Sequence, residues 1–489
     1  LVFTCLCSMV FGVSAESLNI EAYQQAERQL GKHTEKLVTG TLIKPSWNDN
    51  NQLTYSSNTE QGEKFFIIDA VTKQKKLAFD HKKLATALSA STKQEVKAEK
   101  LPFTSFELIN NQTISIKIKD DLYQCNIERY SCEQVKNTAK DNELVAPNGL
   151  HAVYIQDHNL WLRKLSDNSK KQLTTDGVKD FGYGTNNAGW VRDEKPVVKW
   201  SPDSKKLTTF KHDGRNVGEM GIVSTAVGHP KIDVWKYPLP GDKNIFKIHR
   251  VVIDVEQAKV IPLDMPADDH RSTITDHVAG RDGSLLDIDW ASDSSHFAFV
   301  SSTRDHKTAT LKIADATSGK VRTIFTETAE SFFESGVSGI SWKYLDKTHE
   351  FIWFSQRSNW GHLYLIDAAT GKVKNQITQG DWTVLELLNV NQSTGKLIFT
   401  AAGKEGGDPY FHYLYSINKD GSNLTLLTPE QKHHRITLSN DAKYFLDRVS
   451  TPDQPEISFI RSTETKSGFV AEQMDISKLS ATGWKAPTS

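Results

Sequence analysis

Two stretches of this chain align without gaps at an offset of 52 residues: TLKIADATSGKVRTIFT at residues 310–326 and HLYLIDAATGKVKNQIT at residues 362–378. The identical positions include the turn glycines Gly319 and Gly371, and glycine supplies the positive φ that a tight hairpin needs. Each stretch therefore predicts two antiparallel strands joined by the same turn. A structural unit that returns after about 50 residues restricts the chain to a repeat architecture.

Weaker copies of this hairpin bring the total to eight. They lie at residues 66–77, 122–135, 160–174, 252–263, 414–428 and 457–470. A second element, an apolar strand followed by a turn and another apolar strand, recurs at residues 145–149, 200–204, 290–294, 342–346 and 438–442. The two elements together give four strands per repeat, which is typical of a β-propeller blade. An open β-sandwich would explain the turns but not the constant register, so we predict an all-β, eight-bladed β-propeller over residues 41–475.

The charge balance excludes some classes of partner. The chain has 489 residues, 59 of them basic and 60 acidic, and its isoelectric point is near 7.0. Such a balance does not favour binding to nucleic acid or to an anionic membrane surface. We therefore expect no nucleic-acid partner.

The first fifteen residues are apolar and end in Val13-Ser14-Ala15, which resembles a cleavage site for signal peptidase. The chain begins with Leu1, so we interpret residues 1–15 as an incomplete signal peptide. A transmembrane anchor is the alternative, but the run is shorter than the roughly 18 residues that a spanning helix needs. Residues 16–40 are expected to form an amphipathic helix, over residues 17–37, and a linker. The protein is accordingly expected to be periplasmic or secreted.

Two cysteines outside the signal peptide, Cys125 and Cys132, lie on either side of an expected hairpin turn. In an exported protein these residues favour a disulfide over two free thiols. Two cysteines without neighbouring histidines are too few for a metal site. The sixteen histidines are scattered, and we interpret the pairs His433/His434 and His270/His277 as structural residues. We expect neither a metal nor a cofactor.

No nucleophile motif stands out in the sequence. The nearest approach to Gly-x-Ser-x-Gly is Gly336-Val-Ser-Gly-Ile340, which ends in isoleucine and falls between expected strands. No His-Glu-x-x-His, phosphate-binding loop or dinucleotide-binding motif occurs. We therefore predict no catalytic residue in this chain.

One charged cluster could bind a ligand. Arg192, Asp193 and Glu194 lie between a segment rich in glycine and aromatic residues and the strand that leads to Trp200. Two adjacent carboxylates can hold an ammonium group, because charge-assisted hydrogen bonds strengthen where water is partly excluded. A solvated surface turn is the alternative, and the residues alone favour it. The proline-rich stretch at residues 228–241 predicts a rigid extension of the same blade.

Several motifs, in a fixed order along the chain, favour a ligand site over a surface turn. They are WFSQRSNWGHLYL (353–365), QGDW (379–382), DPY (408–410), LY (414–415), DG (420–421), LLTP (426–429), WV (190–191), WSPD (200–203) and KYPLPG (236–241). Over residues 40–470 this set resembles the N-terminal β-propeller of the dipeptidyl peptidase IV family of serine exopeptidases. The resemblance implies an eight-bladed ring that covers an α/β-hydrolase domain carrying Ser, Asp and His, and on which the N-terminal helix also packs.

In that family two propeller glutamates bind the free α-amine of the peptide, so that dipeptides are released. The matching residues here are Asp193 and Glu194, with Arg192 beside them. The pair differs from the family pattern in its aspartate, and Lys195 follows it, which puts strict dipeptide specificity in doubt. The resemblance also implies peptide substrates with a free N-terminus and a possible homodimer.

Residues 476–489 resemble the start of the linker to the hydrolase domain. We therefore expect the chain to be part of a longer peptidase and to be inactive alone. The alternative is a freestanding periplasmic propeller that binds a peptide or protein without catalysis.

Overall fold

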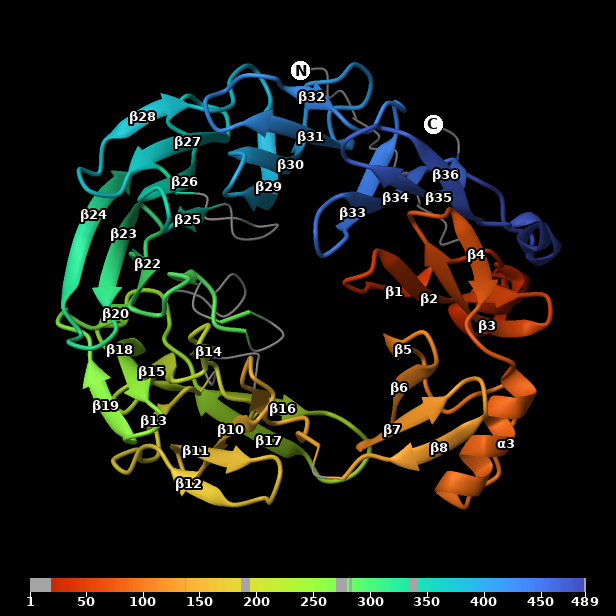
Figure 1. The fold of residues 1–489 in the computed structure, drawn as a ribbon, viewed down its shortest axis with the longest axis horizontal. Coiled ribbons are helices and arrows are strands. Elements are labelled where there is room, and N and C mark those ends of the chain that lie inside the picture. Colours follow the sequence, from red (N-terminus) through yellow and green to blue (C-terminus); the bar gives the residue numbers. More distant parts are fainter. Residues whose placement is uncertain are drawn as a thin grey trace, which may run out of the picture.

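The structure is a computed structural model and describes residues 19–136, 138–185, 194–269, 279–280, 284–333 and 342–487. Eight antiparallel sheets follow one another clockwise around a ring, from the red N-terminal sheet to the blue C-terminal one (Figure 1). The first strand of each sheet lies toward the centre of the ring and the last strand lies at its rim. The predicted all-β, eight-bladed β-propeller with a short N-terminal helix is confirmed.

The strands of each blade come from one continuous segment. Blade 1 has β1 (Ile43–Trp47), β2 (Gln52–Thr59), β3 (Gly62–Asp69) and β4 (Gln74–Leu77); blade 2 has β5 (Phe106–Asn110), β6 (Thr113–Ile118), β7 (Asp121–Asn126) and β8 (Ser131–Gln134); blade 3 has β9 (Leu144–Val145), β10 (His151–Gln156), β11 (Asn159–Lys164) and β12 (Lys170–Gln172). Blade 4 has β13 (Phe181–Tyr183), β14 (Lys199–Trp200), β15 (Lys206–Asp213), β18 (Lys247–Asp254), β19 (Lys259–Pro262) and β20 (Asp268–Asp269), with an inserted hairpin of β16 (Glu219–Ser224) and β17 (Lys231–Lys236).

The second half of the ring is more regular. Blade 5 has β21 (Ile288–Trp290), β22 (His296–Ser302), β23 (Thr308–Asp315) and β24 (Val321–Thr328); blade 6 has β25 (Lys343–Leu345), β26 (Glu350–Ser355), β27 (His362–Asp367) and β28 (Val373–Gln376). Blade 7 has β29 (Thr383–Asn391), β30 (Lys396–Ala402), β31 (His412–Asn418) and β32 (Thr425–Leu426); blade 8 has β33 (His433–Leu438), β34 (Tyr444–Thr451), β35 (Gln454–Ser462) and β36 (Gly468–Gln473).

The 52-residue register corresponds to the outer hairpins of blades 5 and 6. Gly319 and Gly371 end their turns with φ of 74° and 70°. Both also touch the preceding blade: a Cβ on Gly319 would lie 2.3 Å from the Pro262 carbonyl oxygen, and one on Gly371 would lie 2.1 Å from that of Ile324. The shared glycine therefore serves both the turn and the packing between blades.

Apolar side chains fill the spaces between blades. Phe210 and Ile248 of blade 4, for example, share one buried cluster with Ile288 and Phe297 of blade 5. The ring closes in the same way, since Leu53 of blade 1 packs in a cluster with Leu446 of blade 8. Because each blade needs a neighbour to bury its faces, the ring is stabilised by blade-to-blade burial rather than by one central core.

Hydrogen bonds also link the turns between the first and second strands of neighbouring blades. The Asn148 N–H donates to Ser204 Oγ (3.1 Å), and the Asp203 N–H donates to Ser294 Oγ (3.1 Å). The Ser-Pro-Asp-Ser turn after Trp200 therefore joins three blades. This finding explains why similar turns recur along the sequence.

The helices are few and short. They are α1 (Ile20–Arg28), α2 (Gly31–Thr34), η1 (Glu35–Leu37), α3 (His81–Thr92) and η2 (Ser477–Thr482). The N-terminal helix expected over residues 17–37 is divided at Gln29 and Leu30, and no residue of α1 is buried. None of the helices in the described ranges has the length and apolar character needed to cross a bilayer.

Helix α3 was not expected from the sequence. It begins at Asp80, whose carboxylate accepts hydrogen bonds from the Lys82 and Lys83 N–H groups (2.9 and 3.1 Å), a favoured N-cap arrangement. Leu84 and Leu88 of α3 are buried with side chains of blades 1 and 2. The helix therefore covers the outer part of the junction between these blades (Figure 1).

The structure joins Cys125 to Cys132 by a disulfide. The two residues are direct partners on β7 and β8, and their Cα atoms are 4.1 Å apart. The bridge closes a short hairpin of blade 2. Cys125 is also buried in the cluster of apolar side chains between blades 1 and 2, so the bridge contributes to that packing.

Candidate functional site

The predicted anchor lies in an insertion within the innermost strand of blade 4. Strands β13 and β14 both pair with β15, and residues 185–196, here called the anchor loop, interrupt the strand between them. The base of the loop is closed by a hydrogen bond of 2.8 Å from the Val197 N–H to the Gly184 carbonyl oxygen. Arg192 and Asp193 lie outside the described residues, whereas Glu194 is described and exposed.

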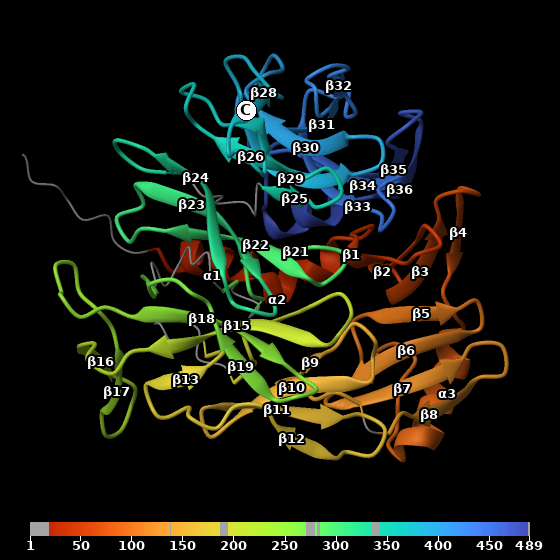
Figure 2. The same ribbon diagram turned by 60° about the vertical axis from the view of Figure 1, so that its left-hand side comes forward.

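A cavity of about 390 Å³ lies where the anchor loop begins. Residues 214–246, here called the arm, run between β15 and β18 and carry the hairpin of β16 and β17 (Figure 2). The arm forms the other side of this cavity, which we call the arm pocket. Its lining residues are His158, Lys179, Asp180, Gly182, Thr185, His212, Gly214, Glu219, Val234, Trp235, Lys236 and Phe246. Gly182 belongs to β13, and Thr185 is the first residue of the anchor loop. Because both line the pocket, the loop leaves the sheet at the edge of the pocket.

Small residues keep the pocket open. The His212 ring stacks on Phe246, with 4.7 Å between the ring centres. A Cβ on Gly214 would lie 2.7 Å from the Phe246 ring, and one on Gly182 would lie 3.2 Å from the His158 side chain. Larger side chains at these two glycines would displace the aromatic wall.

The pocket carries charges of both signs. Lys236 Nζ lies 3.3 Å from Glu219 Oε1 on the arm side, and Lys179 and Asp180 lie on the blade side. His158 of blade 3 and His212 of blade 4 also line the pocket. Carboxylates can accept hydrogen bonds from an ammonium group and lysines can donate to a carboxylate or carbonyl oxygen, so this arrangement suits a short peptide.

Two cationic side chains of blade 4 pack against the ring of Phe181, in the strand that leads to the anchor loop. Lys211 Nζ and the Arg215 guanidinium each lie 4.1 Å from the centre of its ring. The hydrogen bond from Lys211 Nζ, of 2.6 Å, lowers the pKa of Asp176, and the pair with Arg215 lowers the pKa of Asp213. These contacts help to hold β13, the strand that precedes the anchor loop, against β15.

One hydroxyl–histidine pair resembles part of a catalytic site. Ser295 Oγ lies 2.7 Å from His296 Nδ1, but His296 Nε2 meets the Tyr344 hydroxyl at 2.9 Å rather than a carboxylate. The pair lies at the turn between β21 and β22 and in a contact between blades 5 and 6. Its partners indicate a structural role.

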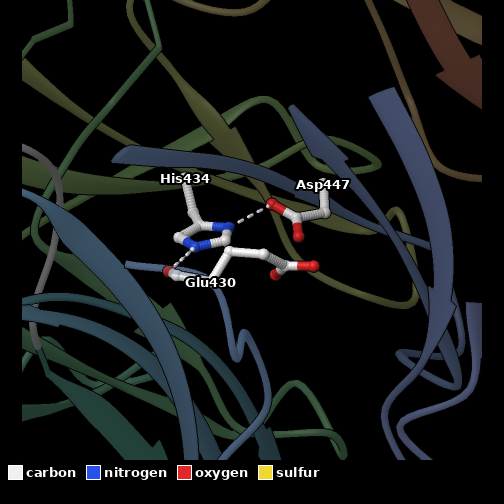
Figure 3. Close-up of side chains that lie close together, drawn as sticks. All are labelled: Glu430, His434 and Asp447. Carbon is white, nitrogen blue, oxygen red and sulfur yellow. Dashed lines mark hydrogen bonds and ion pairs between the residues drawn. The ribbon is translucent and has the colours of Figure 1, made fainter. Parts of the chain in front are cut away.

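Glu430, His434 and Asp447 form the one group of possible metal ligands in the described part of the chain (Figure 3). His434 Nδ1 lies 2.8 Å from Asp447 Oδ1, and His434 Nε2 lies 2.9 Å from the Glu430 carbonyl oxygen. Arg461 donates to both carboxylates, at 2.8 Å to Asp447 and 2.7 Å to Glu430. Both ring nitrogens are thus engaged and a guanidinium competes for the oxygens, so we interpret the group as a buried ion network.

Comparison with known proteins decides the family. The sequence model of the family described as "Dipeptidyl peptidase IV (DPP IV) N-terminal region" matches residues 100–456, which is 357 of the 489 residues. The chain belongs to this family. The resemblance inferred from the sequence motifs is confirmed.

Curated relatives of this dipeptidyl peptidase IV propeller chain include the dipeptidyl-aminopeptidase B of Aspergillus niger. It is 26% identical over 347 residues, which cover 65% of this chain and 37% of that protein. A relative from Aspergillus oryzae, described as "Probable dipeptidyl-aminopeptidase B", is 24% identical over 339 residues, which cover 64% of this chain and 36% of that protein. The chain therefore spans about a third of the length of the curated relatives that it matches.

Solved structures show the same fold. A crystal structure from Bacteroides ovatus, described as that of a dipeptidyl aminopeptidase IV, has a TM-score of 0.67 at 19% identity and covers 89% of this chain and 60% of its own. The dipeptidyl peptidase 4 of Porphyromonas gingivalis has a TM-score of 0.65 at 17% identity, with 91% of this chain and 61% of its own covered.

The sequence did not indicate the arm pocket. It is made by His158 of blade 3, His212 of blade 4 and the arm, and these residues are far apart along the chain. The only signal was indirect, since Gly182, Gly184 and the proline-rich extension all fell near the predicted anchor. Their contacts become evident only once blades 3 and 4 are placed side by side.

Proposed function

We propose that this chain is the propeller domain of an exported, serine-type dipeptidyl peptidase. In this proposal the ring controls the access of peptides and holds their free N-terminus, and a separate α/β-hydrolase domain supplies the catalytic triad that this chain lacks. The observation that carries the proposal is the family match over residues 100–456, within a ring of eight blades. Periplasmic or secreted localisation is part of the same proposal.

The position of the anchor loop supports the role in binding the N-terminus. The loop interrupts the innermost strand of blade 4 and leaves the sheet beside the arm pocket. We propose that Asp193 and Glu194 bind the α-ammonium group and that Arg192 assists from the adjacent position. A charge-assisted hydrogen bond of this kind contributes roughly 1.5–3 kcal/mol. Loss of both carboxylates should therefore weaken binding by at least about tenfold.

The two ends of the described chain support attachment of a further domain. The Thr39 N–H donates to the Asp475 carbonyl oxygen at 3.1 Å, and the Asp475 N–H donates back to Thr39 at 2.9 Å. Before this junction in the sequence, Ile20 and Tyr23 of α1 and Leu30, two residues after α1, are between 52% and 74% exposed. Apolar side chains so exposed favour burial against a partner, and we propose the hydrolase domain as that partner.

A homodimer is also proposed. Ile222, Ile232 and Val234 on the arm are each more than half exposed, at 51%, 68% and 51%. They lie on a two-stranded ribbon that extends from the ring (Figure 2). A second copy of the chain could cover them.

Peptide binding tests the anchoring role with this chain alone. Titration calorimetry would compare a tetrapeptide with a free N-terminus and its N-acetylated form, using the wild type and Asp193→Ala/Glu194→Ala. We expect the acetylated peptide and the double variant each to lose at least about tenfold in affinity. Glu128→Ala/Glu133→Ala, which removes two exposed acidic residues from the outer hairpin of blade 2, is the matched control and should bind normally. Equal affinity for both peptides would contradict anchoring.

The catalytic part of the proposal needs the native gene product. We expect its mass to exceed 54.9 kDa by a domain of up to roughly 250 residues. We also expect it to release dipeptides from free N-termini and to be inactivated by a serine-directed phosphonate. A native product of the size of this chain that binds peptides without cleaving them would support the freestanding propeller instead.

A further inference from the structure

A second cavity lies on another part of the ring, between blades 1 and 2. It has a volume of about 720 Å³. Lys44 of β1 lines one side, Phe103 and Phe106 contribute the apolar part, and Lys117 and Lys119 of β6 and its turn line the other side. We call this cavity the lysine hollow. An adjoining cavity of about 410 Å³ shares Lys119 with it, so the two form one extended depression.

Cations predominate along this depression. The lining of the lysine hollow has three lysines and one acidic residue, Glu107. The adjoining cavity adds two further lysines, Lys97 and Lys100, and two acidic residues. The total is five lysines against three carboxylates, in a chain whose overall charge is −1. This excess of positive charge is therefore local.

Within the lysine hollow itself, two of the three ammonium groups lack a carboxylate partner in the described ranges. Lys44 Nζ donates only to the neutral Thr104 hydroxyl, at 2.6 Å, and Lys119 is exposed and makes no side-chain hydrogen bond or ion pair there. Lys117, by contrast, is paired with Asp141. Unpaired lysines beside buried aromatic rings can bind a carboxylate without first breaking an existing ion pair.

The backbone directs Lys44 toward the hollow. Its φ of 48° is unusual for a residue within a strand, and the register of β1 against β2 shifts between Ile43 and Ser46. A bulge of this kind changes the direction of a side chain, and a positive φ is strained for a residue other than glycine. The result is the contact of Lys44 with Thr104, across the hollow from β1.

We propose that the lysine hollow binds an acidic segment of a polypeptide in an extended conformation. Two carboxylate side chains pair with Lys44 and Lys119, and the segment lies over the apolar part between them. An extended chain suits the site because β1 pairs only with β2 and β5 only with β6, which leaves each inner strand with an unpaired edge. The volume is within the range of about 300–1,000 Å³ that is typical of ligand sites.

This inference does not depend on the proposed peptidase function. Fluorescence anisotropy would measure binding of a labelled octapeptide rich in glutamate, acetylated and amidated so that the anchor loop cannot hold its terminus. The same peptide with glutamine in place of glutamate is the first control. We expect saturable binding of the glutamate peptide, at least about tenfold weaker binding of the glutamine peptide, and a marked loss of affinity at 300 mM salt.

Two variants locate the site. Lys44→Gln/Lys119→Gln should weaken binding at least about tenfold, whereas Lys76→Gln/Lys259→Gln, which removes two exposed lysines from other strands, should leave it unchanged. Glu107→Gln removes the single acidic residue of the lysine hollow and should tighten binding about threefold. This variant tests the site by a gain of affinity rather than by a loss.

Four results would overturn the proposal. The first three are the absence of saturable binding, equal affinity of the wild type and Lys44→Gln/Lys119→Gln, and loss of binding to the control double variant as well. Full displacement of the peptide by a few millimolar inorganic phosphate would assign the hollow to small anions and would also overturn the peptide assignment.

Discussion

Gly371 lies so close to the neighbouring blade that its replacement by alanine tests how the ring is held together. Its φ is +70°, and a Cβ would lie 2.1 Å from the Ile324 carbonyl oxygen and 3.1 Å from the carbon of that carbonyl. Normal van der Waals contact begins near 3.4 Å, so blades 5 and 6 would have to separate locally by about 1.3 Å (3.4 minus 2.1). Such overpacking costs about 1–3 kcal/mol, and alanine at this φ adds about 1 kcal/mol. We expect Gly371→Ala to be destabilised by about 2–4 kcal/mol.

Gly149 provides the matched control. Its φ is also +70°, but no atom lies within 4 Å of its would-be Cβ. Gly149→Ala should therefore cost only the backbone term, about 1 kcal/mol. Urea unfolding followed by tryptophan fluorescence gives the free energy of unfolding of each variant, and equal slopes would show that the unfolded state is unchanged. If the two variants are destabilised equally, Gly371 does not act through the contact between blades, and our account of the repeated glycine is wrong.

Two buried charge networks give further predictions. Burial opposes ionisation of Glu350, but hydrogen bonds from Lys374 and Lys419 lower its pKa from 4.5 to about 2. The ionised Glu350 therefore stabilises the fold fully at a pH well above 4.5, and this stabilisation is lost as the pH falls toward 2. At pH 3 the free energy of unfolding of the wild type should be about 2 kcal/mol lower than at pH 7 because of this group, and Glu350→Gln should not show this decrease. Urea titrations of both proteins at pH 7 and pH 3 measure this difference, and parallel losses would contradict it. Asp447→Asn should cost about 3–5 kcal/mol, because it removes the buried carboxylate that His434 and Arg461 share and leaves Arg461 with Glu430 alone. Thermal unfolding checks this, and an unchanged midpoint would refute the ion network.

The blades could be predicted because each one repeats a local pattern. The turn glycines and the alternation of apolar residues are encoded within about 17 residues, and eight copies of the outer hairpin identify eight blades. Helix α3 was missed because its apolar face is narrow, with Leu84 and Leu88 as its largest buried side chains. The N-cap at Asp80 was a signal that could have indicated it.

The candidate site was less predictable for a different reason. The anchor residues could be proposed from the sequence because they form one short cluster, and their role stays a prediction. The arm pocket, by contrast, combines residues of blade 3, blade 4 and the arm. The lysine hollow likewise combines Lys44 with a segment some 60 residues away in the sequence, as the Lys44–Thr104 hydrogen bond shows. Contacts of this kind depend on how neighbouring blades are placed, which the repeat pattern does not specify.

The segment from Phe181 to Ser204 contains both a predicted binding loop and a repeated turn of the ring. Strands β13 and β14 are two pieces of the innermost strand of blade 4, and each is held to β15 by regular pairing. The anchor loop leaves this strand from its middle, whereas the turn after Trp200 ends it and bonds to the turns of blades 3 and 5. The strand segments on both sides of the insertion are therefore held in place, by pairing within blade 4 and, after Trp200, by hydrogen bonds to the neighbouring blades. A loop inserted at this point starts and ends on backbone that is already fixed by the ring.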